Sequence, residues 1–178
     1  MKELSMHVLD IVENSVAAGA SKVEISLEED KEKNVLIIQI TDDGKGMDGA
    51  MMRNVLDPFV TTKAGKRVGL GLSLLLEAAK RSGGGMTVDS RPGRGTVVKA
   101  TFGLDHVDRQ PVGDMVETVV MLVVGNTSVR FQYRTKKNKR SACWDTARIE
   151  ERFENVQNHI PELADFIREE LRHVHSFD

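Results

Sequence analysis

The segment Leu9–Ala20, LDIVENSVAAGA, constrains the fold of this chain most, because it predicts a helix with two different faces. On one face Asp10 and Asn14 lie one turn apart, with Glu13 beside them. Another side carries an ordinary core-facing stripe, made of Leu4, Val8, Ile11, Val12 and Val16. One side should therefore pack on other elements, while the other presents a carboxylate and a carboxamide toward a common point. Taken alone, this polar face is most simply a solvated surface.

Two strands follow this helix and lead into a glycine-rich turn. Apolar and polar residues alternate over Lys22–Glu28, which is typical of a half-buried strand, and its inward residues should be Val23, Ile25 and Leu27. Glu28–Asn34 predicts a hairpin turn. Val35–Thr41 predicts a second strand. Its residues Ile37, Ile38 and Ile40 are expected to be buried. This strand runs directly into Asp42-Asp-Gly-Lys-Gly-Met47.

The next part of the chain predicts two helices, a loop and a pair of strands. A short helix is expected over Asp48–Leu56, and Phe59–Val68, which lacks periodicity, is interpreted as a mobile loop. Gly69-Leu-Gly-Leu72 then opens a helix that runs to about Ser82 and should pack through Leu72, Leu75, Leu76 and Ala79. The strands are Met86–Ser90 and Thr96–Phe102, around the turn Arg91–Gly95.

The composition changes after Leu104, which predicts a division into residues 1–104 and a smaller C-terminal α/β appendage at 105–178. This appendage should contain a helix, a hairpin and two further helices, at Asp114–Val124, Val129–Arg134 with Arg140–Trp144, Ala147–Val156 and Pro161–His173. It either extends the first sheet or forms a small module, and the sequence leaves both alternatives open. The apolar stripes of its long helices predict internal packing, with a homodimer contact as the alternative.

The overall composition excludes several classes of protein. A net charge of −2 indicates neither a nucleic-acid-binding protein nor a disordered acidic chain, so no direct nucleic-acid partner is expected. The N-terminus lacks a signal pattern, and the longest apolar run, Val119–Val124, is far too short to span a membrane. Cys143 is the only cysteine, which excludes an internal disulfide and fits a reducing compartment. We therefore expect a soluble cytoplasmic protein with Cys143 and Trp144 in its core.

Four sequence elements occur in order, and each has an ordinary explanation when taken alone. They are the Asp10/Asn14 helix, Asp42-x-Gly44-x-Gly46, Gly69-x-Gly71 and Gly93-x-Gly95-Thr96. Asp-x-Gly-x-Gly after a strand is most often a turn, and a glycine pair that opens a helix often serves packing. Glycines between strands are common in hairpins. In this order, however, their combined chemistry is that of a nucleotide pocket.

The first half of such a pocket would bind a flat base. At the end of a strand, Asp42 can accept a hydrogen bond from an exocyclic amine, and a buried hydrogen bond to a charged group contributes about 1.5–3 kcal/mol. Gly44 and Gly46 let the backbone approach a flat ring closely. Met47 offers a soft apolar surface against that ring.

The second half would bind phosphates and a metal ion. Gly69 and Gly71 place bare backbone N–H groups at a helix N-terminus, which is a ready site for phosphate oxygens. The adjacent loop adds cations at Lys63, Lys66 and Arg67. Asn14 supplies a carbonyl oxygen of the kind that Mg²⁺ takes, while the ion keeps waters and bridges phosphates. Asp10 or Glu13 could then orient and deprotonate a nucleophile.

These residues resemble the motifs of the GHKL (Bergerat-fold) ATP-binding domain, which is shared by sensor histidine kinases, anti-sigma-factor serine kinases, mismatch-repair ATPases, type II topoisomerases and a class of heat-shock chaperones. Asp10–Ala20 resembles the N-box of this family, and Val12–Ala20 is especially close to the mismatch-repair version. DPFVTTK at Asp57–Lys63 and GLGLS at Gly69–Ser73 are more similar to sensor histidine kinases. The resemblance covers about Leu4–Phe102, and it implies a two-layer α/β sandwich with a mixed sheet that binds ATP and Mg²⁺.

The resemblance also implies roles for individual residues. Asn14 would hold Mg²⁺, Asp42 would bind the adenine amine and Thr96 would support the base site through water. The loop Phe59–Val68 would fold over the phosphates as a lid. The predicted catalytic residues are Asp10 and Glu13. The predicted nucleotide-binding residues are Asn14, Ala17, Asp42, Gly44, Gly46, Met47, Thr62, Lys63, Gly69, Leu70, Gly71, Leu72 and Thr96.

The chain departs from the family pattern at two points. Many relatives have glutamate four residues before the N-box asparagine, whereas this chain has Asp10, one methylene shorter, so Glu13 stays open as the alternative base. The sequence also lacks the paired-helix segment with a phosphoacceptor histidine that precedes the ATP-binding domain in a complete sensor kinase. His7 lies on the face of Asp10 and Asn14, but we interpret it as a partly exposed helix histidine rather than a phosphoacceptor.

Three functions are compatible with these motifs. The first is a stand-alone protein kinase, histidine-kinase-like or anti-sigma-kinase-like, that transfers the γ-phosphoryl group of ATP to a partner protein in signalling. The second is an ATP-gated binding module or switch with slow or no transfer. The third is an ATP-driven clamp, in which the basic loop Arg134–Arg140 would deliver a lysine to the γ-phosphate, although a solvated hairpin tip explains this loop more simply. The kinase is preferred slightly over the switch, and the clamp is the weakest hypothesis.

Overall fold

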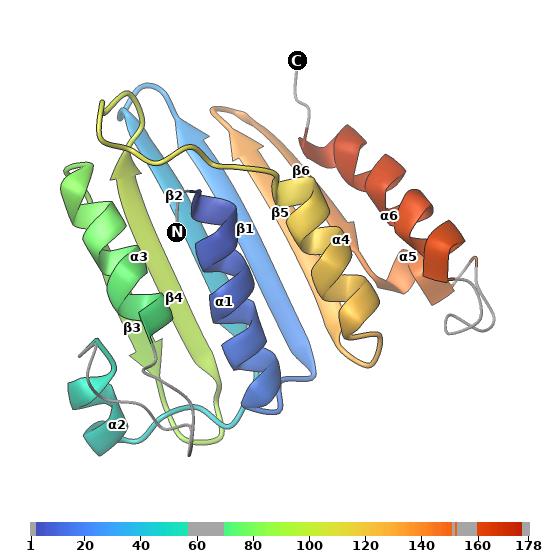
Figure 1. Cartoon of the computed structure of the whole chain (residues 1–178), viewed down its shortest axis with the longest axis horizontal. Helices are drawn as coiled ribbons and strands as arrows, with labels where there is room; N and C mark the ends of the chain where they lie inside the picture. The colour runs from blue at the N-terminus through green and yellow to red at the C-terminus, as the bar shows by residue number, and fades with distance from the viewer. Residues whose placement is uncertain (1–2, 57–69, 151, 153–159, 176–178) are drawn as a thin grey trace.

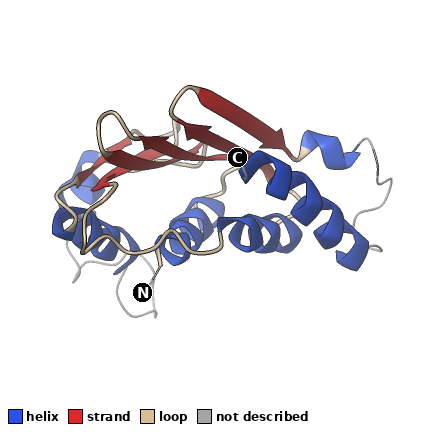
Figure 2. Cartoon of the chain, turned by 90° about the horizontal axis from the view of Figure 1, so that it is seen from above, coloured by secondary structure: helices blue, strands red, loops and turns tan. Residues whose placement is uncertain are grey.

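The computed structural model describes residues 3–56, 70–150, 152 and 160–175 of the chain. These residues form a mixed sheet with helices packed on one of its faces (Figure 1, Figure 2). The helices are α1 (Leu4–Ala17), α2 (Gly49–Asn54), α3 (Leu70–Arg81), α4 (Met115–Gly125), α5 (Ala147–Glu150) and α6 (Ile160–His175). The strands are β1 (Lys22–Asp30), β2 (Val35–Asp42), β3 (Gly85–Ser90), β4 (Thr96–Gly103), β5 (Arg130–Lys137) and β6 (Arg140–Asp145). The expected two-layer α/β sandwich with a mixed sheet is confirmed.

The described strands form one six-stranded sheet in the order β3-β4-β2-β1-β5-β6. Strand β1 pairs antiparallel with β2, where Val23 lies opposite Asp42, and parallel with β5, where Val23 lies opposite Phe131. Strand β5 pairs in turn with β6 as an antiparallel hairpin. The C-terminal appendage therefore extends the first sheet, which decides between the two alternatives that the sequence leaves open. The division into residues 1–104 and 105–178 stays a prediction about folding units.

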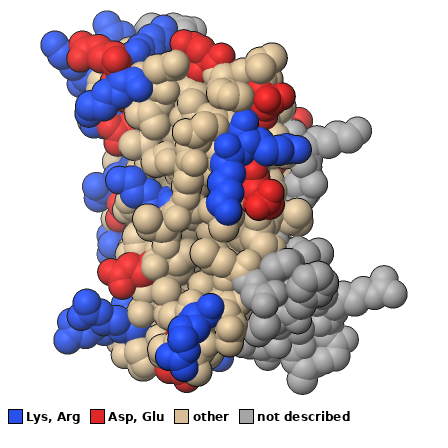
Figure 3. Space-filling model, turned by 90° about the vertical axis from the view of Figure 1, so that its left-hand side faces the viewer, with Lys and Arg blue, Asp and Glu red and all other residues tan. Residues whose placement is uncertain are grey.

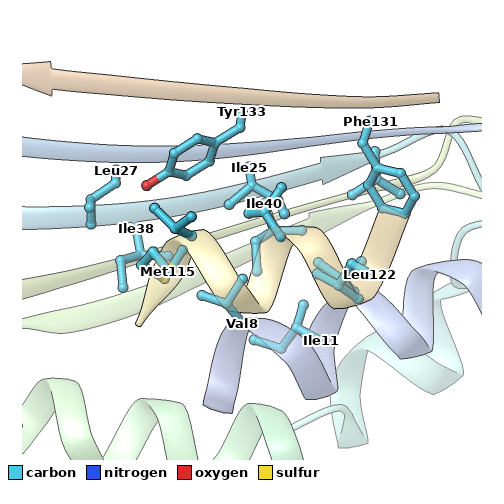
Figure 4. Close-up of a cluster of buried hydrophobic side chains, with 14 of the residues drawn as sticks. Val8, Ile11, Ile25, Leu27, Ile38, Ile40, Met115, Leu122, Phe131 and Tyr133 are labelled. Atoms are coloured by element: carbon cyan, nitrogen blue, oxygen red, sulfur yellow. The ribbon is translucent and has the colours of Figure 1, made fainter. Parts of the chain in front are cut away.

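Side-chain alternation positions the strands on the helices. The inward residues of β1 and β2 are buried: Val23, Ile25, Leu27, Leu36, Ile38 and Ile40. The expectation of a buried Ile37 is wrong, because successive residues of a strand point to opposite faces, and Ile37 lies half-buried on the other face. Side chains from β1, β2 and β5 meet those of α1 and α4 in one core (Figure 4).

Helix α1 lies between α3 and α4 in the helical layer (Figure 1). Its start has no side-chain cap; instead, Leu4 N donates to Pro111 O at 2.9 Å and Ser5 N donates to Val112 O at 2.8 Å. The connector between β4 and α4 thus pairs N–H groups that the first turn of a helix leaves without an internal partner. Backbone hydrogen bonds therefore join the N-terminal helix α1 to the connector that leads into the C-terminal part.

The helices of the C-terminal part pack internally, as the sequence predicts. Helix α4 buries Met115, Val119 and Leu122, and α6 buries Leu163, Ile167, Leu171 and Val174. In α3, Leu75 and Ala79 are buried, whereas Leu72 and Leu76 are half-buried. Of the predicted helix Ala147–Val156, Ala147–Glu150 form α5. Within the described parts of the chain, no helix combines the length and the apolar character that crossing a membrane requires.

Two residues lie in surroundings that differ from the expectation. His7 is only 1% exposed rather than partly exposed, and its Nε2 lies 3.1 Å from Oε1 of Gln110 in the connector. Burial lowers the pKa of His7, and the Gln110 hydrogen bond opposes this shift only in part. Cys143 is exposed rather than in the core. Its neighbour Trp144 points into the core, so alternation along β6 directs Cys143 to the opposite face.

Candidate nucleotide-binding site

Polar residues from neighbouring strands meet at the end of the sheet where β2 finishes. Asp42 of β2 is the Cα partner of Thr96 in β4, and Thr96 is the partner of Ser90 in β3. Directly opposed residues of an antiparallel ladder point to the same face. These three side chains therefore form a row, and the buried Asp42 places that row on the face that carries the helices.

Asp42 is a buried acceptor with a fixed orientation. The residue is 9% exposed; Ser15 Oγ donates to its Oδ2 at 2.7 Å, and Gly44 N donates to its Oδ1 at 2.9 Å. The two donors come from α1 and from the following loop, so they hold the carboxylate between two elements. Each carboxylate oxygen keeps a further lone pair, because an oxygen of this kind can accept two hydrogen bonds. The group is thus suited to accept an N–H from a ligand.

The adjacent Asp43 has a different role, although the sequence presents the two residues as a pair. Its carboxylate accepts hydrogen bonds from the hydroxyl and backbone N–H of Ser21 and from the backbone N–H of Lys22, the last two at 2.8 Å. Burial raises the pKa of Asp43, but these hydrogen bonds outweigh it, so the net shift is downward. Asp43 therefore fixes the start of β1, while Asp42 faces the helices.

The loop after β2 is fixed from both sides. Lys45 N donates to Ala18 O at 3.0 Å, and Gly93 N donates to Lys45 O at 2.8 Å, so the loop joins the end of α1 to the β3–β4 turn. Gly46 has a φ of +67°, and a Cβ on it would lie 2.0 Å from Arg91 O. The missing side chain of Gly46 thus permits the packing of the loop itself. This explains the glycine independently of the predicted contact with a base.

Ser90 connects three parts of the predicted base site. Its Oγ accepts from Met47 N at 2.9 Å, donates to Gly95 O at 2.9 Å and lies 2.8 Å from Thr96 Oγ1. Sequence reasoning singles out neither Ser90 nor Ser15. The register of the β3–β4 hairpin is the signal that finds Ser90, since it places this residue opposite Thr96.

At the predicted phosphate end, the start of α3 lies against the polar face of α1. A Cβ on Gly71 would lie 1.8 Å from Asp10 Oδ2, so the Asp10 carboxylate contacts the backbone of the first turn of α3. A carboxylate in this position interacts favourably with the helix dipole. Glu13, by contrast, is exposed, and Asn14 is half-buried. Of the two predicted bases, Asp10 is the one beside the glycine motif.

The remaining predicted residues divide between described and undescribed parts of the chain. Ala17 is exposed at the end of α1, and Leu72 packs against the core. Helix α3 begins at Leu70. Thr62, Lys63 and Gly69 lie outside the described residues, as do the cations Lys66 and Arg67 and the lid Phe59–Val68. The roles of all these residues stay predictions.

The described residues fit a nucleotide with a divalent ion in the chemistry of their donor and acceptor groups. Asp42 offers a buried acceptor for a base amine. Asn14 offers an amide oxygen, and Mg²⁺ takes one or two protein oxygens together with phosphates and waters. Asn14 and Asp10 share the face of α1 that meets α3, so an ion at Asn14 would lie beside the phosphate end.

The fold is an α/β sandwich with polar residues gathered at one end of its sheet. Residues 2–106 match the family described as Histidine kinase-, DNA gyrase B-, and HSP90-like ATPase. The chain belongs to this family, and its matched region is an ATP-binding, histidine-kinase-like domain of the GHKL type.

The relatives that match this domain include signalling kinases. A putative sensor protein of Shewanella frigidimarina is 29% identical over 109 residues, which cover 60% of this chain and 17% of that protein. Sensor kinase CckA of Brucella abortus is 34% identical over 87 residues, which cover 48% of this chain and 9% of CckA. Sensor histidine kinase YxdK of Bacillus subtilis is 30% identical over 108 residues, which cover 57% of this chain and 33% of YxdK. The chain thus spans a minor part of each relative.

A solved structure shows the same fold over more of the chain. The N-terminal domain of a DNA repair protein superposes with a TM-score of 0.56 over 80% of this chain and 52% of that chain. The two sequences are 16% identical, so the similarity concerns the fold alone.

Proposed function

We propose that this protein binds Mg-ATP and transfers the γ-phosphoryl group to a partner protein, in a cytoplasmic signalling role. The observation that carries the proposal is the contact between Asp10 and Gly71, because it places a carboxylate beside the helix start where phosphates would bind. Kinases among the relatives support the same reaction type.

In this proposal the adenine amine donates a hydrogen bond to Asp42, and Thr96 supports the base through water. Asn14 would hold Mg²⁺, which would neutralise charge on the phosphates. The backbone of the first turn of α3 donates to phosphate oxygens. Asn14 and α3 thus hold the γ-phosphate near Asp10, while Asp42 fixes the opposite end of the nucleotide.

Asp10 then acts on the incoming acceptor group. It accepts the proton of the partner's nucleophile as the bond from that nucleophile to the γ-phosphorus forms. The bond from the γ-phosphorus to the β–γ bridging oxygen breaks, and ADP leaves with the electron pair. General-base assistance of this kind typically contributes about 10²–10⁴-fold to a rate.

Two other functions use the same fold. An ATP-gated switch needs every nucleotide-binding residue but no base. A clamp needs a lysine at the γ-phosphate, and the basic β5–β6 hairpin lies at the wrong end of the sheet for this role. Along β1, the partner of Asp42 is Val23, whereas the partner of Lys137 is Glu29. Val23 and Glu29 are about 20 Å apart along β1, because a strand rises about 3.3 Å per residue.

The first experiment tests the nucleotide site. Asn14→Ala should abolish detectable Mg-ATP binding in isothermal titration calorimetry, because it removes the amide oxygen assigned to the ion. Thr87→Ala, an exposed position on β3, serves as the matched control and should bind like the wild type. Unchanged Mg-ATP affinity in Asn14→Ala would show that the metal placement is wrong.

The second experiment separates kinase from switch. The chain is incubated with γ-labelled ATP and candidate partners, and Asp10→Asn is compared with Glu13→Gln. We expect Asp10→Asn to slow transfer by about 10²-fold or more with little change in nucleotide affinity. Glu13→Gln, at an exposed position, should remain close to wild type. If nucleotide still binds and neither change slows hydrolysis or transfer, the switch is the better description.

A further inference from the structure

The hydroxyl groups at the β3–β4 end of the site have a hydrogen-bond direction that the described contacts determine. Ser90 Oγ has three neighbours: the backbone N–H of Met47, the carbonyl of Gly95 and the hydroxyl of Thr96. A serine hydroxyl has one proton to donate and two lone pairs to accept with. All three contacts can be made at once in only one arrangement.

The carbonyl of Gly95 cannot donate, so the single proton of Ser90 must go to it. The N–H of Met47 can only donate, so it occupies one lone pair of Ser90. The second lone pair of Ser90 must then accept the proton of Thr96 across the 2.8 Å contact. The Thr96 oxygen consequently keeps its lone pairs and has no proton left to offer a ligand.

Asp42, on the neighbouring strand, is also an acceptor of hydrogen bonds. Its carboxylate accepts from Ser15 and Gly44, and its remaining lone pairs can only accept. Asp42 and Thr96 are Cα partners across β2 and β4, so two acceptors of fixed direction lie side by side. A ligand edge that contacts Asp42 and Thr96 directly must therefore bring donors.

We propose that Ser90 is a positioning residue that keeps Thr96 an acceptor and thereby makes the site discriminate against 6-oxo purines. The inference rests on the proposed nucleotide site. A 6-amino purine offers N–H donors at its amine, whereas a 6-oxo purine offers a carbonyl that faces the lone pairs of Asp42 and Thr96. Without Ser90, the Thr96 proton is free to turn toward the ligand and to donate to that carbonyl.

The test compares the affinities of Mg-ATP and Mg-ITP, which differ at the 6 position and neighbouring ring protonation alone. Wild type and Ser90→Ala are titrated by calorimetry, and the readout is the ratio of the ITP to the ATP dissociation constant. We expect this ratio to fall by about fivefold or more in Ser90→Ala, since a polar site built for one partner strongly rejects its counterpart. Ser90→Thr, which keeps the hydroxyl, should restore a ratio close to that of wild type.

A purely structural role for Ser90 predicts a different result. In that case Ser90→Ala weakens both nucleotides equally and the ratio is unchanged, which overturns the inference while leaving the nucleotide site intact. Wild-type protein that binds neither nucleotide overturns the proposed function itself. The exposed Thr87→Ala on the same strand is the matched control and should leave the ratio unchanged.

A second variant keeps the inference testable if Ser90→Ala does not fold. Thr96→Val removes the acceptor and should lower the ratio as well, whereas Thr96→Ser should keep it. A Thr96→Val protein that folds, binds ATP and retains the wild-type ratio contradicts the inference. Circular dichroism of each variant establishes that the compared proteins are folded.

Discussion

At the residue scale, Gly93 and Gly95 share one turn and similar φ angles of +71° and +78°, but their surroundings differ. A Cβ on Gly95 would lie 1.8 Å from Asp42 O, whereas a Cβ on Gly93 meets no described atom within 4 Å. Gly95→Ala should therefore lower the free energy of unfolding by about 3 kcal/mol or more, because both backbone strain and a backbone clash act. Gly93→Ala should lower it by only about 1–2 kcal/mol. Urea unfolding followed by circular dichroism measures both; equal effects would contradict the clash.

His7 gives a prediction about pH. Burial lowers its pKa in the folded protein below the usual value of 6.5. Below that value the unfolded chain binds a proton at His7 that the folded protein does not, so the free energy of unfolding should decrease as pH falls. The largest slope for one such group is about 1.4 kcal/mol per pH unit.

The measurement is urea unfolding between about pH 7.5 and about pH 5.5, the range in which histidine usually titrates. His7→Gln should reduce the slope, because it removes the titrating group and keeps a polar side chain. Burial also lowers the pKa of His175, so His175→Gln is the matched control for the remaining slope. Asp145 does not interfere, since the balance of its contacts puts its pKa at about 2. A slope that His7→Gln leaves unchanged would refute this assignment.

Single residues also show where sequence reasoning ends. The position of Asp42 at the end of a strand is predictable, because the alternating pattern of the strand leads directly into it and glycines follow. The contacts of Ser15 and Ser90 are not predictable, because Ser15 depends on the packing of α1 on β2 and Ser90 depends on the register of β3 with β4. The predicted exposures of His7 and Cys143 are wrong for a related reason. The connector that carries Gln110 covers His7, and the inward orientation of Trp144 directs Cys143 to the opposite face of the sheet.

At the scale of elements, two polar contacts hold the end of α6 on β5, and the one made by Thr135 is buried. Thr135 Oγ1 donates to Val174 O at 2.6 Å, and Tyr133 Oη lies 2.8 Å from His175 Nδ1. Thr135→Val should leave the Val174 carbonyl without this donor and destabilise α6 by about 1–3 kcal/mol. Amide hydrogen exchange of α6 should speed up correspondingly.

An exposed contact of the same helix serves as the control for this prediction. Arg148 pairs with Glu170 on α6, but its side chain is 56% exposed. Exposed ion pairs contribute about 0–1 kcal/mol, so Arg148→Ala should change exchange in α6 only slightly. If the two variants accelerate exchange equally, burial is not what makes the Thr135 contact important.

The elements themselves were the most predictable level of the structure. Strict alternation in Lys22–Glu28 predicts β1 and its inward residues, because successive side chains of a strand point to opposite faces and only one face is buried. The start of α3 and the turn before β4 follow from glycines whose backbone positions exclude side chains. The pairing of β5 with β1 could not be predicted, since the residue pattern of a strand does not indicate which distant strand it pairs with.

At the scale of the whole molecule, two surfaces that a partner could meet both carry mixed charge. On the side formed by β3 and α3, basic and acidic side chains are interspersed over a mostly neutral surface (Figure 3). A partner that docks there would meet mixed charge rather than a field of one sign. The open face of the sheet also mixes its charges, with Glu24 paired to Arg134 and Glu28 to Lys136 across β1 and β5.

The continuous sheet predicts how strongly residues 1–104 depend on the rest of the chain. Strand β5 pairs with β1 from Lys22 to Glu29, so removing residues 105–178 would turn β1 into an open edge. The same truncation removes the carbonyls of Pro111 and Val112 that cap α1, and it uncovers the side of α1 that packs on α4. Exposed edges of this kind favour association between chains.

We therefore expect a chain ending at residue 104 to unfold without a cooperative transition, or to associate, while the full chain is cooperative. Size-exclusion chromatography and thermal unfolding followed by circular dichroism measure both properties on matched preparations. The expected loss has three physical sources: the eight-residue β1–β5 ladder, the α1 cap and the α1–α4 packing. A truncated chain that is monomeric, cooperative and able to bind Mg-ATP would instead show that the predicted division near Leu104 separates two folding units. In that case the C-terminal strands would extend the sheet without being needed to stabilise it.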